Sequence, residues 1–167
     1  AVGPGFNPER VTTAVIPVTG STFGGASRKA GFYELLLERL QNSPGIESAA
    51  AVNHVPLVGD RWGFSFAVEG EDPLPSGSSQ PVAAYRVATP GYFETIGAQL
   101  IEGRDIAAAD RRDAAPVVVV NQTFARQYLQ GRAGAVSSRV RFGDDQPWRE
   151  IVGVVADLQQ RSWADVV

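Results

Sequence analysis

The longest uninterrupted run of branched aliphatic residues in the sequence, Val117 to Val120, is only four residues long. A membrane-spanning helix needs about 20 consecutive apolar residues, so the sequence as given contains no candidate membrane span. A short apolar run of this kind is typical of a strand that is covered on both faces. The chain must therefore build its core from several short elements, and 167 residues suffice for one domain or two small lobes.

The composition excludes several classes of function. Hydrophobic residues make up 44% and charged residues 20%, which is the usual mixture of a folded globular chain. The net charge of −3 provides no positive field, so we predict no nucleic-acid partner. The chain has no cysteine, which excludes disulfides, a thiol nucleophile and a cysteine-ligated metal.

The start of the chain carries no targeting signal. Its first residues, AVGPGFNPERV, form neither the apolar core of a signal peptide nor a membrane helix, and the sequence contains no methionine. We therefore expect a chain that was processed or excised from a longer protein.

Residues 1–56 are predicted to form a first lobe with a strand-helix-strand pattern. Val11 to Val18 is rich in β-branched residues and alternates, as a strand does, and Ile46 to Val52 is a second candidate strand. Between them, Ser27 to Gln41 has the apolar spacing of an amphipathic helix, which Pro44 and Gly45 end. The apolar face that should pack on the strand at residues 11–18 consists of Phe32, Leu35, Leu36 and Leu40.

Residues 57–167 are predicted to form a second, mixed α/β lobe, which makes the fold class α+β with two lobes. Phe64 to Val68 alternates apolar and small residues, as a half-buried strand does. The loop that follows, Gly70 to Pro81, is rich in Pro, Gly and Ser. The remaining predicted elements are a strand at Val82 to Ala88, a helical turn at Thr89 to Ile96, the strand at Val117 to Val120, and a hairpin of Arg139 to Phe142 with Trp148 to Val155.

Asn121 stands where a strand passes into a helix. We predict that its side chain caps a helix whose buried face is Phe124, Ala125, Tyr128 and Leu129. Because a carboxylate also accepts hydrogen bonds from helix amides, Asn121→Asp is expected to be tolerated. Asn121-Gln122-Thr123 also fits a glycosylation acceptor, which is a weak three-residue pattern.

No established catalytic or cofactor-binding motif occurs, so we predict no catalytic residue, no cofactor and no metal. His54 is the sole histidine, and a Ser-His-Asp site with His54 as the base stays formally open beside the simpler reading as a loop histidine. An acidic cluster fits no calcium loop and is expected to be neutralised by neighbouring arginines. Its members are Glu102, Asp105, Asp110 and Asp113, interleaved with Arg104, Arg111 and Arg112.

Two loops offer further candidates. Trp62 and Arg61, in the loop from Gly59 to Gly63, are a candidate partner contact, and the alternative is that Trp62 is a partly buried plug beneath the loop. Gly20 to Gly25 could cradle an anion or could be a plain flexible connector.

Four segments in order resemble a known family. They are GFNPERVTTAVIPV, FYELLLERLQNSPGIESAAAVNHVPL, TPGYFETIGAQLIEGRDI, and VVVVNQTFARQYL with WREIVGVVADL. Together they cover essentially the whole chain and resemble the periplasmic core domain of MacB-like, FtsX-like ABC transporter permeases, in particular the orphan permease group. The most specific piece is Pro90 to Asp105. The sequence departs from the family at Gln130 to Arg139, where a Pro- and Lys-containing turn is usual.

The resemblance implies a domain on the periplasmic face of the bacterial inner membrane, within an integral membrane protein. In that setting the partners are the ABC ATPase, the transmembrane helices of the parent protein, and a periplasmic adaptor or substrate. The domain is expected to be non-catalytic and to transmit ATPase-driven conformational change. Family members continue beyond the position of Val167, so the first lobe is expected to be incomplete.

Two other classes of function stay open. A free-standing extracytoplasmic module that binds a small ligand or peptide would need a concave pocket with convergent polar groups. A hydrolase would need a nucleophile within reach of His54. If strands of the first lobe lack neighbours, the fragment is expected to self-associate through the exposed edges at residues 11–18 or 46–52.

Overall fold

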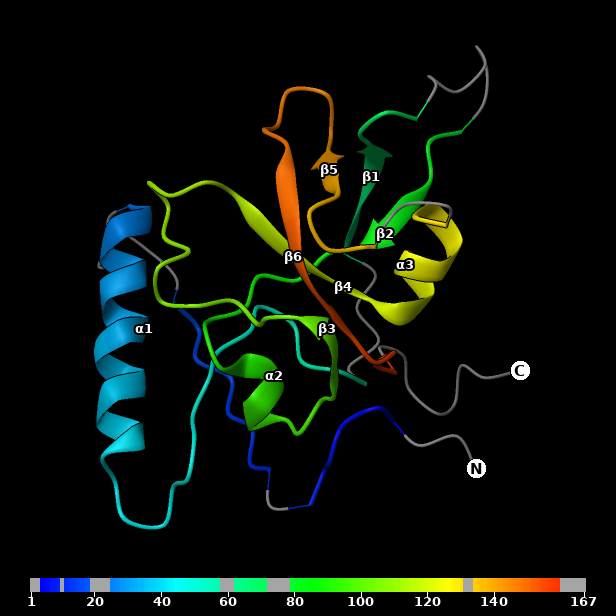
Figure 1. The fold of residues 1–167 in the computed structure, drawn as a ribbon. Helices are drawn as coiled ribbons and strands as arrows, with labels where there is room; N and C mark the ends of the chain where they lie inside the picture. The colour runs from blue at the N-terminus through cyan, green and yellow to red at the C-terminus, as the bar shows by residue number, and fades with distance from the viewer. Residues whose placement is uncertain are drawn as a thin grey trace.

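The structure is a computed structural model, and it describes residues 4–9, 11–18, 25–57, 62–71, 79–130 and 134–159. Within these residues the chain forms three helices and six strands, so the α+β class predicted from the sequence is confirmed (Figure 1). In chain order the elements are α1 (Ala26–Gln41), β1 (Gly63–Val68), β2 (Val82–Ala84), α2 (Tyr92–Thr95), β3 (Leu100–Gly103), β4 (Val117–Asn121), α3 (Gln122–Tyr128), β5 (Arg139–Phe142) and β6 (Arg149–Val155).

One mixed sheet organises the described residues. Its strand order is β2-β1-β5-β6-β3, with every neighbouring pair antiparallel, and β4 pairs with β6 in parallel, off this path. The β4–β6 pair shifts register between Val118 and Val119, which marks a bulge. As a result, β6 is covered by neighbours on both edges, and all residues from Ile151 to Val155 are buried.

The hydrophobic core lies between this sheet and α3. Ile151 and Val140 are fully buried, and Phe66 and Phe142 come from the neighbouring strands. The ring of Phe124, on α3, lies 4.9 Å from the ring of Phe66. This helix is held on the sheet because its apolar face carries the side chains predicted from the sequence: Phe124 and Leu129 are buried, and Ala125 and Tyr128 pack against the same cluster.

The predicted cap at the start of α3 is confirmed. Asn121 is extended, with φ −87° and ψ 165°, and its side-chain oxygen accepts a hydrogen bond from the backbone N–H of Phe124 at 3.1 Å. The hairpin of β5 and β6 is also confirmed, with Arg139 opposite Glu150 and Val140 opposite Arg149. β1 forms as predicted, whereas β2 covers only the first three residues of the predicted strand, and Ala88 makes an isolated bridge to Val52.

The strand-helix-strand pattern predicted for the first lobe is wrong in this structure. The helix forms over Ala26–Gln41, but residues 11–18 form no strand, and of residues 46–52 only Val52 makes a bridge. Val15 is 92% exposed and Leu35 is 58% exposed. Figure 1 shows α1 at the side of the molecule rather than across a face of the sheet. A β-branched segment becomes a strand only when a neighbouring strand pairs with it, and residues 11–18 have no such neighbour among the described residues.

Two further features concern the helices. The short helical turn predicted around Thr89 to Ile96 is present as α2, which follows Gly91 and ends before Gly97, and both glycines have positive φ. In the described part of the chain, no helix is long and apolar enough to cross a membrane.

Candidate functional site

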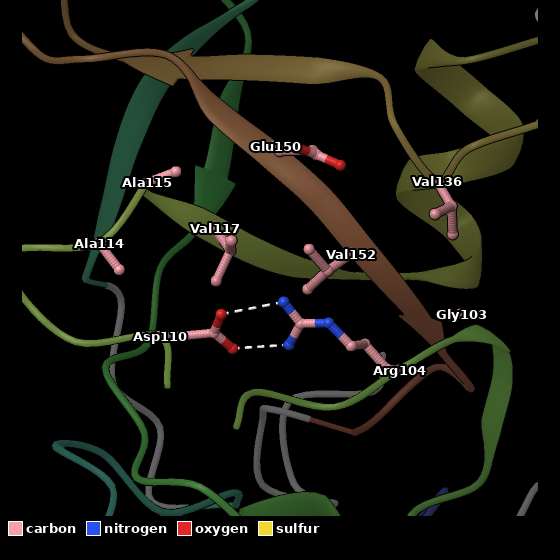
Figure 2. A pocket seen from close by; sticks show the side chains of 9 residues that line it. All are labelled: Gly103, Arg104, Asp110, Ala114, Ala115, Val117, Val136, Glu150 and Val152. Atoms are coloured by element: carbon pink, nitrogen blue, oxygen red, sulfur yellow. Dashed lines mark hydrogen bonds and ion pairs between the residues drawn. The ribbon is translucent and has the colours of Figure 1, made fainter. Parts of the chain in front are cut away.

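A groove of about 430 Å³ lies beside β4 and β6 and the loop that follows β3 (Figure 2). On β6, Ile151 belongs to the buried core cluster, whereas Val152, at the bulge, lines the groove. The chain leaves β3 at Arg104, whose backbone N–H donates to the carbonyl of Val152 at 2.8 Å, and this places the loop after β3 beside the groove. The lining residues are Gly103, Arg104, Asp110, Ala114, Ala115, Val117, Val136, Glu150 and Val152.

An ion pair between Arg104 and Asp110 is the main polar feature of the groove. The two guanidinium nitrogens Nη1 and Nη2 donate to the two carboxylate oxygens of Asp110 at 2.6 and 2.9 Å, and Figure 2 shows both bonds. The same carboxylate accepts from the backbone N–H of Ala107 at 2.7 Å, and Arg104 also donates to the carbonyl of Asp105 at 3.0 Å. The pair therefore fixes the conformation of the loop as well as its charge.

The surroundings shift the pKa of neighbouring carboxyls in opposite directions. The hydrogen bonds from Arg104 hold the pKa of Asp110 below its ordinary value, although partial burial opposes this shift. The pKa of Asp105 is raised, mainly because burial disfavours its charged form; a 2.6 Å hydrogen bond from the backbone N–H of Ile106 acts in the opposite direction. The pKa of the Arg104 guanidinium is raised by its hydrogen bond to Asp110.

The chemistry available in the groove suits binding. Its floor is apolar, with Val117, Val136 and Val152, and its charged groups are the neutralised pair and Glu150. Among the described residues, no three His, Asp or Glu side chains gather closely enough to hold a metal ion. The predicted neutralisation of the acidic cluster is seen at Asp110, and the groove does not include His54.

The candidate contact residue Trp62 belongs to an aromatic cluster at the β1–β2 end of the sheet. Its ring centroid lies 5.3 Å from that of Phe64, 5.9 Å from that of Tyr85 and 5.4 Å from that of His54. Tyr85 in turn lies 5.0 Å from Phe142 of the core. Trp62 is 40% exposed, so part of its side chain faces solvent while the rest packs on its neighbours.

Two other sequence candidates fall wholly or largely outside the described residues. Arg61, the second member of the predicted contact loop, lies outside them, as does all of the Gly20 to Gly25 segment except Gly25.

Sequence reasoning missed Asp157, which follows β6 and meets the start of α3. Its carboxylate accepts hydrogen bonds from the Asn121 side chain at 2.7 Å and from the Thr123 backbone N–H at 2.8 Å. The only available signal was a carboxylate shortly after a strand, and nothing local links it to a helix that begins 35 residues earlier.

Fold and groove together define an α+β domain with a surface suited to binding. A family profile described as the MacB-like periplasmic core domain matches residues 6–166. The chain therefore belongs to this family, as its sequence resemblance indicated. No curated protein matches the sequence.

One solved structure supports the fold, and a second is reported for comparison. The periplasmic region of MacB from Actinobacillus actinomycetemcomitans is similar with a TM-score of 0.50 at 16% identity, over 75% of this chain and 50% of that chain. A domain of a protein described as a permease, from Porphyromonas gingivalis, has a TM-score of 0.46 at 18% identity, over 74% of this chain and 49% of that chain. The chain thus spans about half the length of these structures.

Proposed function

We propose that this chain is a non-catalytic domain on the periplasmic face of the inner membrane, within an ABC-type permease, and that it transmits ATPase-driven conformational change to a periplasmic partner or substrate. The observation that carries the proposal is the family match over residues 6–166. The partners that follow from it are an ABC ATPase and the membrane helices of a parent protein. The proposal also keeps the division into lobes at residues 1–56 and 57–167.

The absence of a catalytic role is part of this proposal. A hydrolase would need a nucleophile and an oxyanion site around His54, and the carboxylates of the groove do not supply them. The Asp110 carboxylate is committed to Arg104 and to the N–H of Ala107, so it is poorly suited to act as a general base. No cofactor is part of the proposal.

Trp62, with Arg61, is the proposed contact for a periplasmic partner. A partly exposed tryptophan that rests on other rings is preorganised, because little side-chain freedom remains to be lost on binding. The matched test uses Trp62→Ala against Trp62→Phe in the parent protein and measures partner capture. If Trp62→Ala loses partner capture and Trp62→Phe retains it, the contact is supported. If both variants capture the partner as well as wild type does, the contact is refuted.

The groove favours a second candidate, a free-standing module that binds a small ligand or peptide. Its volume of about 430 Å³ lies within the range of small-molecule sites. The two candidates differ in their setting: a permease domain is tethered to membrane helices, whereas a free module is released by osmotic shock of the cells.

We also propose that the 167-residue chain self-associates through residues 11–18 or 46–52. Val15 and Ile16 are exposed, and residues 11–18 pair with no strand of the described sheet. Sedimentation at several concentrations should show association that Val15→Lys weakens. A chain that is monomeric at every concentration would contradict this part of the proposal.

The test of location uses the absence of cysteine in this sequence. A single cysteine is placed at Asp145, an exposed residue of the β5–β6 turn, in the parent protein with any other cysteines replaced. After the outer membrane is permeabilised, we expect a membrane-impermeant maleimide to label it, and the labelled protein to sediment with the membranes. Labelling only after lysis of the inner membrane would overturn the periplasmic assignment, and labelled protein in the soluble periplasmic fraction would favour the free module.

A further inference from the structure

The side chain of Asp157 is the centre of a dense set of hydrogen bonds at the start of α3. Its Oδ1 accepts from Asn121 Nδ2 at 2.7 Å and from the Thr123 N–H at 2.8 Å. Its Oδ2 accepts from the Thr123 hydroxyl at 2.7 Å and from Arg126 Nη2 at 3.3 Å. These four bonds fasten the segment that follows β6 to the helix.

The backbone of the same segment holds the N-terminal segment, residues 4–9. The N–H of Gln159 donates to the carbonyl of Pro4 at 2.9 Å. Gly5, with φ 80°, passes so close to Asp157 that a Cβ at residue 5 would collide with the Asp157 carbonyl. On the other side, the N–H of Asn7 donates to the carbonyl of Ile96 at the end of α2, also at 2.9 Å.

We propose that Asp157 is a clasp that fastens the N-terminal segment and the segment after β6, as a pair, to α3. Gly5 lies against the Asp157 backbone carbonyl, the Gln159 N–H donates to Pro4, and the Asp157 carboxylate binds Thr123, so a displacement of residues 4–9 can reach α3 through Asp157. α3 then passes it to the core through Phe124, which packs on Phe66. The contacts alone support the clasp; only its use in transmitting motion depends on the proposed function.

The clasp is also the place where this part of the molecule should open first. The Asp157 side chain is 41% exposed, so water competes for its hydrogen bonds. The core behind it is closed, since Ile151 and Val140 are fully buried. Local unfolding occurs most readily in regions that have exposed hydrogen bonds and few buried contacts. The two segments should therefore detach together while the sheet and its core stay folded.

The test is reciprocal and uses residue-resolved amide hydrogen exchange by NMR on the whole 17.8 kDa chain. Gly5→Ala pushes the N-terminal segment away from Asp157 without touching α3. We expect it to speed exchange of the Thr123 amide roughly tenfold, the factor that corresponds to about 1.4 kcal/mol. In the opposite direction, Asp157→Ala should speed exchange of the Asn7 and Gln159 amides by a similar factor.

Gly45→Ala is the matched control, because Gly45 also has positive φ, 85°, while a Cβ there meets no atom within 4 Å. It should leave exchange at Thr123, Asn7 and Gln159 unchanged. If Asp157→Ala does not fold, Thr123→Val is used instead. It removes only the bond from the Thr123 hydroxyl to Asp157, and its effect is measured as the exchange rate of the Gln159 amide. The clasp is refuted if Gly5→Ala speeds exchange only at Asn7 and Gln159, since Asp157 would then be a helix cap alone. Because this experiment needs no membrane or ATPase, its result is independent of the location test.

Discussion

Replacing Asn121 by aspartate should destabilise this domain, which reverses the expectation drawn from helix capping alone. A carboxylate also accepts hydrogen bonds from helix amides, so capping alone predicts that aspartate is tolerated. In the structure, however, the Asn121 side chain makes two hydrogen bonds: its oxygen accepts from the Phe124 N–H, and its Nδ2 donates to Asp157 at 2.7 Å. Aspartate keeps the first hydrogen bond, loses the second, and places its own carboxylate beside that of Asp157.

The magnitude follows from these two bonds. Asn121→Ala removes both bonds: the cap alone is worth about 1 kcal/mol, or about 2–4 °C in Tm for a chain of this size, and the bond to Asp157 is lost as well. Asn121→Asp retains the cap but forfeits a hydrogen bond to a charged group, worth about 1.5–3 kcal/mol where it is sheltered. It also adds a like-charge contact. Since Asp157 is 41% exposed, solvent screening reduces both effects. Both variants lose the bond to Asp157, so they differ only in the cap that aspartate keeps and in the repulsion that it adds, and we expect similar losses at pH 7.

Thermal unfolding of wild type, Asn121→Ala and Asn121→Asp at pH 7 and pH 4 is the assay. Repulsion between two carboxylates raises the pKa at which one of them takes up a proton, so the penalty in Asn121→Asp is present at neutral pH and is relieved as pH falls. The alanine variant should show no such recovery. An aspartate variant as stable as wild type at pH 7 would show that Asn121 does not donate to Asp157.

Other predictions concern the loop after β3 and the core. The pKa of Asp110 is lowered, so its pairing with Arg104 stabilises the fold above the unfolded-state pKa of about 3.9, and this stabilisation is lost as pH falls through the folded-state value. Asp110→Asn should cost about 1 kcal/mol at pH 7, and the free energy of unfolding from urea denaturation should fall less steeply with acid in this variant. The pKa of Asp105 is raised, so its charged form at pH 7 destabilises the fold. Asp105→Asn should therefore leave Tm at pH 7 equal or higher, and a clear fall in Tm would contradict the burial of Asp105 as a charged group. Ile151→Ala should cost about 2–5 kcal/mol in the same denaturation series, whereas exposed Leu35→Ala should stay within about 0.5 kcal/mol; equal losses would show that the core is misplaced.

Elements with a complete local signal could be predicted from the sequence. The passage from β4 through the Asn121 cap into α3 combines an apolar run, a capping residue and an amphipathic face, and all three are local. The β5–β6 hairpin has a Gly-Asp-Asp turn between apolar stretches. The α1 helix likewise has apolar spacing and a Pro-Gly end.

Elements that depend on distant partners could not be predicted in this way. All four residues of β3 are exposed and show no alternation, and the strand exists because it pairs with β6 about fifty residues later. Residues 11–18 show the converse, because strong β propensity without a neighbour gives no strand. In the site, the neutralisation of the acidic cluster was foreseeable from composition, but the pairing of Arg104 with Asp110 depends on the loop conformation.

The central claim, that this domain transmits the action of an ATPase, is tested most directly by distance measurement in the parent permease. A nitroxide at residue 145 and a second one at the periplasmic end of a membrane helix report how the domain sits relative to the membrane. We predict that the distance distribution shifts when the ATPase is held in its ATP-bound state. Superimposable distributions with and without ATP, while a label pair in the ATPase reports its closure, would contradict the account.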